Sequence, residues 1–357
     1  LNKKVNNKME TKHVSRFSPI NLIIISLFYF KCNINHEPLI IPENNQLDKV
    51  EVQVRETIKK MADLILKNPN DVQRWANYAM TLDVHDFTLE AIIAYQKAES
   101  LDENNFRWPF FQAIALQSLG DEKNLELYRK SIRINDGYTP IYNLYGKALY
   151  EYGYIDSSTV YFLKAIQKFP CSPTALNHLA KTYLIENQLE LADSILIKMK
   201  ECGRAGKTYY TLLSDLSRKK GNATLSMDLA TKANNMLAPK NIMYNPIYDQ
   251  VTDMGVSSAW YRYRAQKYFN NQVYEKAIKE YTELIKIKSL PIDHFNLGLA
   301  YNKIGQLKMA ENHYKVCLNI NPNYADALKK LAQIFKDKGD LKKYYFYLNE
   351  YGKVITE

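Results

Sequence analysis

The sequence predicts an all-α solenoid built from about eight helix-turn-helix repeats. Two stretches far apart in the chain, "RWANYAMTLDVHDFTLEAIIAYQKA" (74–98) and "HFNLGLAYNKIGQLKMAENHYKVCL" (294–318), place aromatic and small residues at matching offsets. The composition, with 12 Gly, 12 Pro, 28 Tyr and 46% hydrophobic residues in 357, is that of an ordered chain. Self-similarity at such a period indicates one continuous array rather than separate globular domains.

The pattern has a simple physical explanation. Within each repeat, the recurring large and small residues of the first helix (helix A) share one stripe, and those of the second helix (helix B) share another. Small residues on these stripes let two backbones approach, and aromatic rings fill the remaining space. Glycine is expected at the end of helix A and proline after helix B, where each ends a helix. The third and seventh repeats show the pattern most fully: Tyr142, Tyr145, Gly146, Leu149, Phe162, Ala165 and Pro170; His294, Leu297, Gly298, Tyr301, Ala310, Tyr314, Cys317 and Pro322.

These residues resemble the tetratricopeptide repeat (TPR), a pair of antiparallel helices about 34 residues long. The resemblance implies a right-handed superhelix whose concave inner wall binds a protein or peptide. In that family, ligands contact helix-A positions 2, 5, 9 and 12 of a repeat. The stretch "NNFRWPFF" (104–111) carries Pro109 within the predicted first turn of a helix A, where the missing N–H removes no intrahelical bond. "FRWPFF" also resembles a motif of a group of bacterial cell-envelope TPR proteins, which tend to carry an insertion like 246–249.

The N-terminal residues have the pattern of an export signal or membrane anchor. A basic stretch precedes the apolar run "INLIIISLFYF" (20–30), which is shorter than the ~20 residues that span a bilayer. Cys32 follows directly and resembles the lipid-attachment cysteine of bacterial lipoproteins; an uncleaved anchor is the alternative. The sequence thus predicts a membrane-anchored location in the bacterial cell envelope, with the repeats outside the cytoplasm.

Six segments are expected from these boundaries. They are an export signal or anchor (1–31), a tether (32–46), an N-terminal capping helix (47–71), repeats one to five (72–239), an inter-repeat insert (240–257), and repeats six to eight with a C-terminal cap (258–357). The insert reads either as a connecting loop or as a segment that folds back onto the groove.

Nothing in the sequence indicates catalysis, a cofactor or a metal. The six histidines lack metal-ligand spacing, and no phosphate-binding loop or nucleophile motif occurs. The net charge of +10 suggests nucleic acid, but acids alternate with the basic residues outside the leader, which is typical of solvated helix faces. Cys317 falls at a small core position. Cys171 and Cys202 fall in successive inter-repeat turns, and helix spacing of ~10 Å argues against a disulfide between them.

The candidate binding residues are the polar side chains at helix-A groove positions. Asparagine can pair with both donor and acceptor of a peptide backbone, and lysine can meet a carboxylate. The candidates are Asn143, Lys147, Asn177, Lys181, Arg262 and Gln266. This Asn/Lys ladder is similar to the carboxylate clamp of chaperone-binding TPR domains, although repeat five offers Thr208, Thr211 and Asp215 where the clamp has basic residues.

Two functions follow from this interpretation. The first is a non-catalytic scaffold that holds a protein or peptide segment in its concave groove. The alternative is an accessory subunit of an envelope enzyme or assembly complex, contacted through the outer edges of the repeats.

Overall fold

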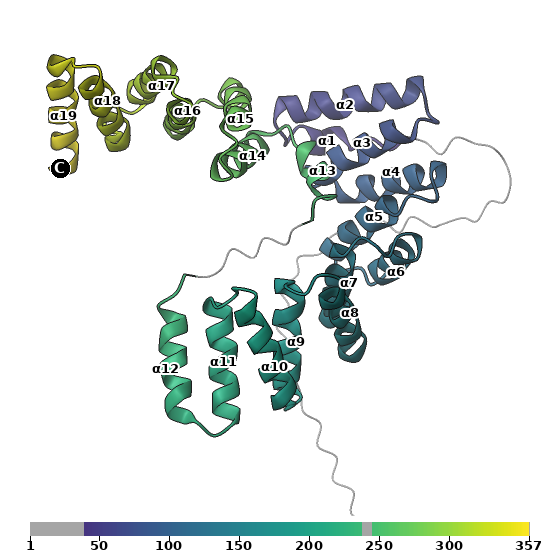
Figure 1. Ribbon diagram of the computed structural model, residues 1–357. Helices are drawn as coiled ribbons and strands as arrows, with labels where there is room; N and C mark the ends of the chain where they lie inside the picture. Colours follow the sequence, from purple (N-terminus) through teal and green to yellow (C-terminus); the bar gives the residue numbers. More distant parts are fainter. Residues whose placement is uncertain (1–38, 238–244, 357) are drawn as a thin grey trace, which may run out of the picture. The chain divides into compact units, whose positions relative to one another are not determined.

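The computed structural model describes residues 39–237 and 245–356, and these residues contain nineteen α-helices and no strand (Figure 1). Leu39–Glu357 form one compact unit. The expected leader, the tether up to residue 38 and Cys32 lie outside the described residues. Sixteen of the helices form eight consecutive pairs in which each helix A contacts the helix B that follows it.

The eight pairs are, in order, α3 (Val72–Val84) with α4 (Thr88–Leu101), α5 (Arg107–Ser118) with α6 (Asn124–Ile134), α7 (Pro140–Glu151) with α8 (Ile155–Lys168), α9 (Pro173–Ile185) with α10 (Leu189–Glu201), α11 (Lys207–Lys219) with α12 (Ala223–Asn234), α14 (Ser258–Asn270) with α15 (Tyr274–Ile287), α16 (Pro291–Lys303) with α17 (Leu307–Ile320), and α18 (Ala325–Asp337) with α19 (Leu341–Thr356). We number these pairs as repeats one to eight.

The turn between helix A and helix B has the same backbone conformation in every pair. One residue of each turn has positive φ, and five of these residues are the glycines that the sequence pattern placed there: Gly120, Gly153, Gly221, Gly305 and Gly339. Glycine adopts this left-handed conformation without the steric penalty of a Cβ atom. Asp86, Asn187 and Gln272 occupy the same position in the other three pairs, at φ of 58–66°. The turn is therefore a feature of the fold rather than of glycine.

The core is made where small residues of one helix meet aromatic residues of the next. A Cβ atom built on Gly298 in α16 would lie 2.6 Å from the Tyr314 ring in α17, and one on Gly146 in α7 would lie 3.0 Å from Phe162 in α8. Glycine therefore stands at these two predicted small positions because the facing ring leaves no room for a side chain. Cys317 is buried and free, as expected for a small core residue. Pro109 is the third residue of α5, within its first turn.

Two elements precede repeat one. The first, α1 (Asn44–Leu47), is a single turn. The second, α2 (Val52–Lys67), contacts α3. The helix α2 buries Val54, Ile58, Ala62 and Ile65, which lie three or four residues apart and so form one stripe. This helix therefore covers the outer face of the first repeat.

The described part of the insert does not run as a connecting loop. It contains a short helix, α13 (Asp249–Asp253), which contacts α3 in the first repeat (Figure 1). Val251 is fully buried in the same apolar cluster as the residues of repeats one to three. Of the two alternatives that the sequence left open, the described residues adopt the fold-back.

The expectation that Cys171 and Cys202 are not bridged was wrong. The two form a disulfide, with their Cα atoms 5.5 Å apart. The helix spacing of ~10 Å describes the middles of packed helices. Both cysteines instead lie just beyond the ends of helices B, Cys171 three residues after α8 and Cys202 directly after α10. At these ends the inter-repeat turns converge, and their Cα atoms come within the range that a disulfide needs.

Candidate peptide-binding faces

The helix-A face of repeats one and two is covered by the chain itself. Residues 245–256, which we name the folded-back segment, place Ile247, Tyr248, Met254 and Val256 against the N-terminal core cluster. The ring of Tyr248 meets Phe111 edge-on, with centroids 6.2 Å apart. The apolar burial stabilises this contact, at about 25 cal/mol for each Å² removed from water.

Polar contacts fix the register of the folded-back segment. The hydroxyl of Tyr138 donates to Asn245 Oδ1 at 2.5 Å and accepts from the backbone N–H of Ile247 at 3.1 Å. Arg107 donates to Gln250 Oε1 at 3.4 Å. Just beyond the segment, the indole N–H of Trp260 donates to the carbonyl oxygen at the end of α3 at 2.7 Å. These bonds join positions more than a hundred residues apart.

Two titratable groups of repeat one lie beneath this segment, and burial shifts their pKa values in opposite directions. Desolvation raises the pKa of Asp83 to about 7, although the hydrogen bond from Tyr95 lowers it. Burial lowers the pKa of His85 to about 4. His85 Nε2 accepts the N–H of Val256 at 3.1 Å, which requires an unprotonated nitrogen.

The helix-A face of repeats three and four differs, because it presents polar residues. Of the predicted ladder, Lys181 is exposed, Asn177 and Lys147 are half-buried, and Asn143 is only 6% exposed. Lys147 Nζ lies 3.4 Å from Glu151 on its own helix, which is a weak surface pair. Among the described residues, Lys181 makes no ion pair. Whether these four residues contact a ligand stays a prediction.

His178 links the two lysines of this face. Its ring stacks on Phe162 at 4.7 Å, and its buried Nδ1 has no hydrogen-bond partner in the described part of the chain. Burial and, to a smaller extent, the positive charges of Lys181 and Lys147 together lower the pKa of His178 to about 4. The structure therefore brings the two predicted lysines close enough to act on one imidazole.

The two candidates in repeat six have partners within the protein. The guanidinium of Arg262 forms two hydrogen bonds to the fully buried carboxylate of Asp293, at 2.8 and 2.7 Å. Removing Arg262 would leave that charge buried without a partner. Gln266 donates to Asn270 at 2.9 Å. The structure thus separates Arg262 and Gln266, which are committed to local contacts, from the ladder of repeats three and four.

A cavity of about 480 Å³ adjoins this ladder, and the sequence pattern did not predict it. It is lined by the first turns of α7 and α9, by the loops before α9 and α11, and by Pro246 of the folded-back segment. Asn143 lies in its wall, and Asn143 Oδ1 accepts a hydrogen bond from the hydroxyl of Ser172 at 2.9 Å. The signal that could have found the cavity is the pair of cysteines, because their disulfide joins two of the lining loops.

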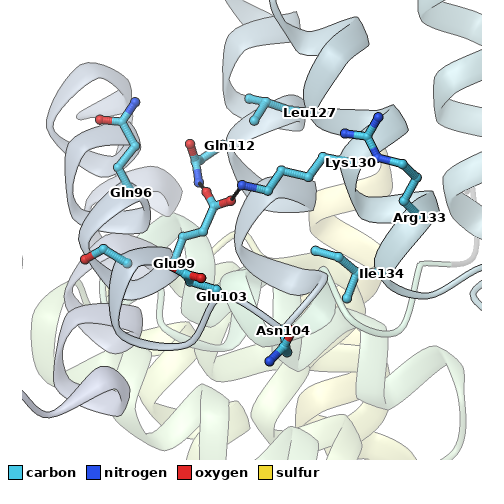
Figure 2. Close-up of a pocket in the computed structure, with 10 residues that line it drawn as sticks. Gln96, Glu99, Glu103, Asn104, Gln112, Leu127, Lys130, Arg133 and Ile134 are labelled. Carbon is cyan, nitrogen blue, oxygen red and sulfur yellow. Dashed lines mark hydrogen bonds and ion pairs between the residues drawn. The ribbon is translucent and has the colours of Figure 1, made fainter.

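A second cavity, of about 720 Å³, lies among α4, α5 and α6. Figure 2 shows Glu99 between Gln112 and Lys130, and both contact its carboxylate. Because this buried acid is already paired, the cavity offers a ligand fewer free polar groups.

Neither a metal site nor a membrane span is found in the described part of the chain. Over residues 39–237 and 245–356, no three His, Cys, Asp or Glu side chains gather closely enough to hold a metal ion. None of the helices there combines the length and apolar character that crossing a membrane requires.

Comparison with known proteins supports the repeat assignment. The tetratricopeptide-repeat family model matches residues 294–324, which span α16 and α17. An uncharacterised protein of Pyropia yezoensis, Ycf37, is 40% identical over 97 residues, which are 26% of this chain. The match spans 53% of that relative.

Solved structures with a similar arrangement are TPR proteins of low identity. YrrB, described as having an unusual peptide-binding site, is 17% identical, with a TM-score of 0.43 over 48% of this chain and 90% of its own. A TPR protein of Parabacteroides merdae is 15% identical, with a TM-score of 0.44 over 74% and 94%. The type IV pilus biogenesis factor PilW is 17% identical, with a TM-score of 0.41 over 56% and 90%.

The family match falls on one helix pair, and the same turn conformation and small-against-aromatic packing recur along the chain. Residues 294–324 thus form a tetratricopeptide repeat, and the helix pairs around them share its all-helical fold.

Proposed function

We propose that the protein is a non-catalytic scaffold of the bacterial cell envelope, which holds an acidic, extended protein segment against the helix-A face of repeats three and four. The observation that carries the proposal is the pair Lys147 and Lys181. Both side chains stand on a face that the folded-back segment leaves open, and both act on His178. Two neighbouring ammonium groups favour a ligand with carboxylates.

The location outside the cytoplasm is supported by two independent features. The basic and apolar N-terminal residues have the pattern of an export signal, and Cys32 is suited to lipid attachment. The disulfide between Cys171 and Cys202 belongs to an oxidising compartment. Mass spectrometry of the protein isolated from membranes tests both, because it detects an acylated Cys32 and an oxidised cysteine pair.

The binding test uses peptides selected from a randomised twelve-residue library against residues 39–357. We expect the selected peptides to be enriched in Asp and Glu. The double variant Lys147→Ala/Lys181→Ala should bind them roughly tenfold more weakly, since each of two ion pairs at a solvent-accessible face contributes up to about 1 kcal/mol. The matched control is Lys164→Ala/Lys200→Ala, which removes two exposed lysines from helices B.

His178 provides a direct spectroscopic readout. A carboxylate bound between Lys147 and Lys181 would offset their positive charges and so raise the low pKa of this imidazole. We expect the NMR titration of His178 to move to higher pH when an acidic peptide is added. An unchanged titration, or equal binding by the groove variant and its control, would reject the face of repeats three and four.

The second candidate function is contact with a larger complex through helices B. Large apolar side chains are exposed there, among them Val160, Leu163, Leu191 and Ile197 on α8 and α10. Crosslinking in the native envelope distinguishes the two candidates. Crosslinks from α8 and α10 that survive the groove substitutions would favour the complex, whereas crosslinks lost with the lysines would favour the groove.

A further inference from the structure

The cavity next to Asn143 combines an apolar lining with positive charge. Its rings come from Tyr138, Phe169 and the prolines 140, 173 and 246. No acidic residue lines it, whereas Lys168 and Arg204 do. Arg204 is exposed and makes no ion pair among the described residues. Lys168 lies 3.7 Å from Asp136, a distance at which its charge is only weakly compensated.

A buried amide faces this cavity with a free donor. The hydrogen bond from Ser172 fixes the Asn143 amide through its oxygen. The Nδ2 atom of Asn143 donates no hydrogen bond to any described residue, although the side chain is more than nine-tenths buried. A ligand carbonyl or carboxylate at this point would accept a hydrogen bond from the Asn143 amide N–H.

The disulfide joins two of the loops that line the cavity. Phe169 and Ser172 flank Cys171 in one loop, and Arg204 follows Cys202 by two residues in the other. Because the bond joins the two loops covalently, the cation and the apolar lining keep a fixed separation. A preformed site of this kind loses less ordering free energy when it binds.

The geometry points to a specific role, which rests on the proposed function: the cavity is the anchor site for one aliphatic side chain of the bound segment, followed in that segment by carboxylates that pair with Arg204 and Lys168. The volume of about 480 Å³ accepts a leucine-sized side chain with its backbone. Asn143 and Lys147 are four residues apart and share one face of α7, so a chain leaving the cavity continues onto the lysine ladder.

An acidic peptide fits this site better than a free small molecule or a nucleic acid. The cavity adjoins an extended polar face, and it carries only two cations on its rim. A phosphate backbone requires a longer track of positive charge. A peptide uses all three features together: the apolar lining, the free amide donor and the two cations.

The test uses three fluorescein-labelled peptides. The first has one leucine and two following aspartates in a glycine–serine chain. The second replaces the leucine with glycine, and the third replaces the aspartates with asparagine. Fluorescence anisotropy with residues 39–357 should show the second binding roughly tenfold or more weakly, because a buried leucine side chain contributes about 1.5–3 kcal/mol. The third should bind about two- to fivefold more weakly, as expected for charges at an exposed rim.

Two protein variants form a matched pair. Thr174→Trp fills the cavity from the first turn of α9, and Thr208→Trp places the same ring at the equivalent position of α11, one repeat further along. Both threonines are half-buried, so helix content measured by circular dichroism controls for folding in each. We expect Thr174→Trp to abolish the preference for leucine over glycine and Thr208→Trp to keep it.

The outcomes separate the cavity from the groove. If Thr174→Trp binds the leucine peptide like the unmodified protein, the anchor assignment is wrong, even when Lys147→Ala/Lys181→Ala weakens binding. If only Thr174→Trp weakens binding, the anchor stands and the lysine ladder fails. Equal affinity for the leucine and glycine peptides, or no binding of either at millimolar concentration, overturns the anchor site.

Discussion

The folded-back segment covers the helix-A face of repeats one and two, whereas the same face of repeats three and four is open. The difference follows from residue type at equivalent positions. At the groove positions 5 and 9 of helix A, the first two repeats carry Ala76, Met80, Phe110 and Ile114. The next two carry Asn143, Lys147, Asn177 and Lys181. Ala76, Met80 and Phe110 are buried and Ile114 is partly buried, in the same cluster that the folded-back segment packs against. Lys181 is exposed and Lys147 is half-buried.

The comparison teaches that one scaffold face can serve two purposes in the same chain. An apolar helix-A face must be covered to remove it from water, and here the chain supplies the cover itself. A polar face needs no cover and remains available to another molecule. The folded-back segment begins at the cavity, where Pro246 forms part of the wall, so the covered and open faces meet at this point.

The strongest test of how the helix-A face of repeats one and two is covered is Val251→Asp. Val251 is fully buried in the N-terminal cluster, and a carboxylate there would lose its hydration without gaining a partner. We expect a loss of about 4 kcal/mol or more in the docking of the folded-back segment. Hydrogen exchange of the amides in 245–256 should accelerate, and that of α9 and α10 should not change.

Val160→Asp is the matched control, because Val160 is 48% exposed on α8. If slow exchange in 245–256 survives Val251→Asp, the segment is held by something other than its apolar contacts.

The second prediction concerns the disulfide between Cys171 and Cys202, in the region of repeats three and four. Cys171→Ser/Cys202→Ser removes a bond between residues 31 positions apart, which contributes about 2–4 kcal/mol in the chain-entropy account. In a repeat array, each unit is stabilised mainly by its neighbours, so the loss should stay local. Hydrogen exchange should accelerate in α8 to α11 and stay slow in α3 to α5. Uniform acceleration along the chain would show that the array unfolds as one unit.

The sequence was sufficient for the repeat architecture because helix-pair packing depends on local spacing. Turn glycines such as Gly120 and Gly305, and small residues such as Gly298, report directly on backbone shape. The long-range contacts were not predictable in the same way. Nothing local pairs Asn245 with Tyr138, or Arg262 with Asp293, so the fold-back remained one of two alternatives and Arg262 was read as a groove residue.

The disulfide was missed for a related reason. Helix spacing was applied to Cys171 and Cys202, although both stand in turns that converge. One available signal was not used. Apolar residues at groove positions, such as Met80 and Phe110, already indicate that some other part of the chain covers the first two repeats.

The third prediction uses pH to separate two opposing groups under the folded-back segment. The pKa of Asp83 is raised to about 7, so its contribution to stability is full below about pH 4 and is lost as pH rises through 7. The pKa of His85 is lowered to about 4, so its contribution is full above about pH 6.5 and is lost as pH falls through 4. The two dependences oppose each other, and we expect nearly constant stability of the N-terminal repeats between about pH 4 and 6.5.

Single substitutions should reveal each dependence. His85→Gln should leave stability that falls as pH rises from about 4 to 7, because Asp83 is then the remaining titrating group of the pair. Asp83→Asn should leave stability that falls as pH decreases from about 6.5 to 4. Urea unfolding followed by tryptophan fluorescence measures both, because Trp75, Trp108 and Trp260 all lie in or against the N-terminal core cluster. Parallel pH profiles for the two variants would contradict the assignment.

The smallest expected effect concerns Trp108, in the stretch "FRWPFF" of repeat two. Trp108 is 2% exposed, yet its indole N–H has no hydrogen-bond partner in the described part of the chain. Trp108→Phe removes apolar area but also removes a buried, unpaired donor, and the two changes offset each other. We expect a change of less than about 1 kcal/mol in the free energy of unfolding. Phe111→Ala in the same helix should by contrast lose roughly 3–5 kcal/mol, because Phe111 contacts Tyr248 and is fully buried. Equal losses of unfolding free energy for the two variants would show that Trp108 makes a stabilising contact of its own in repeat two.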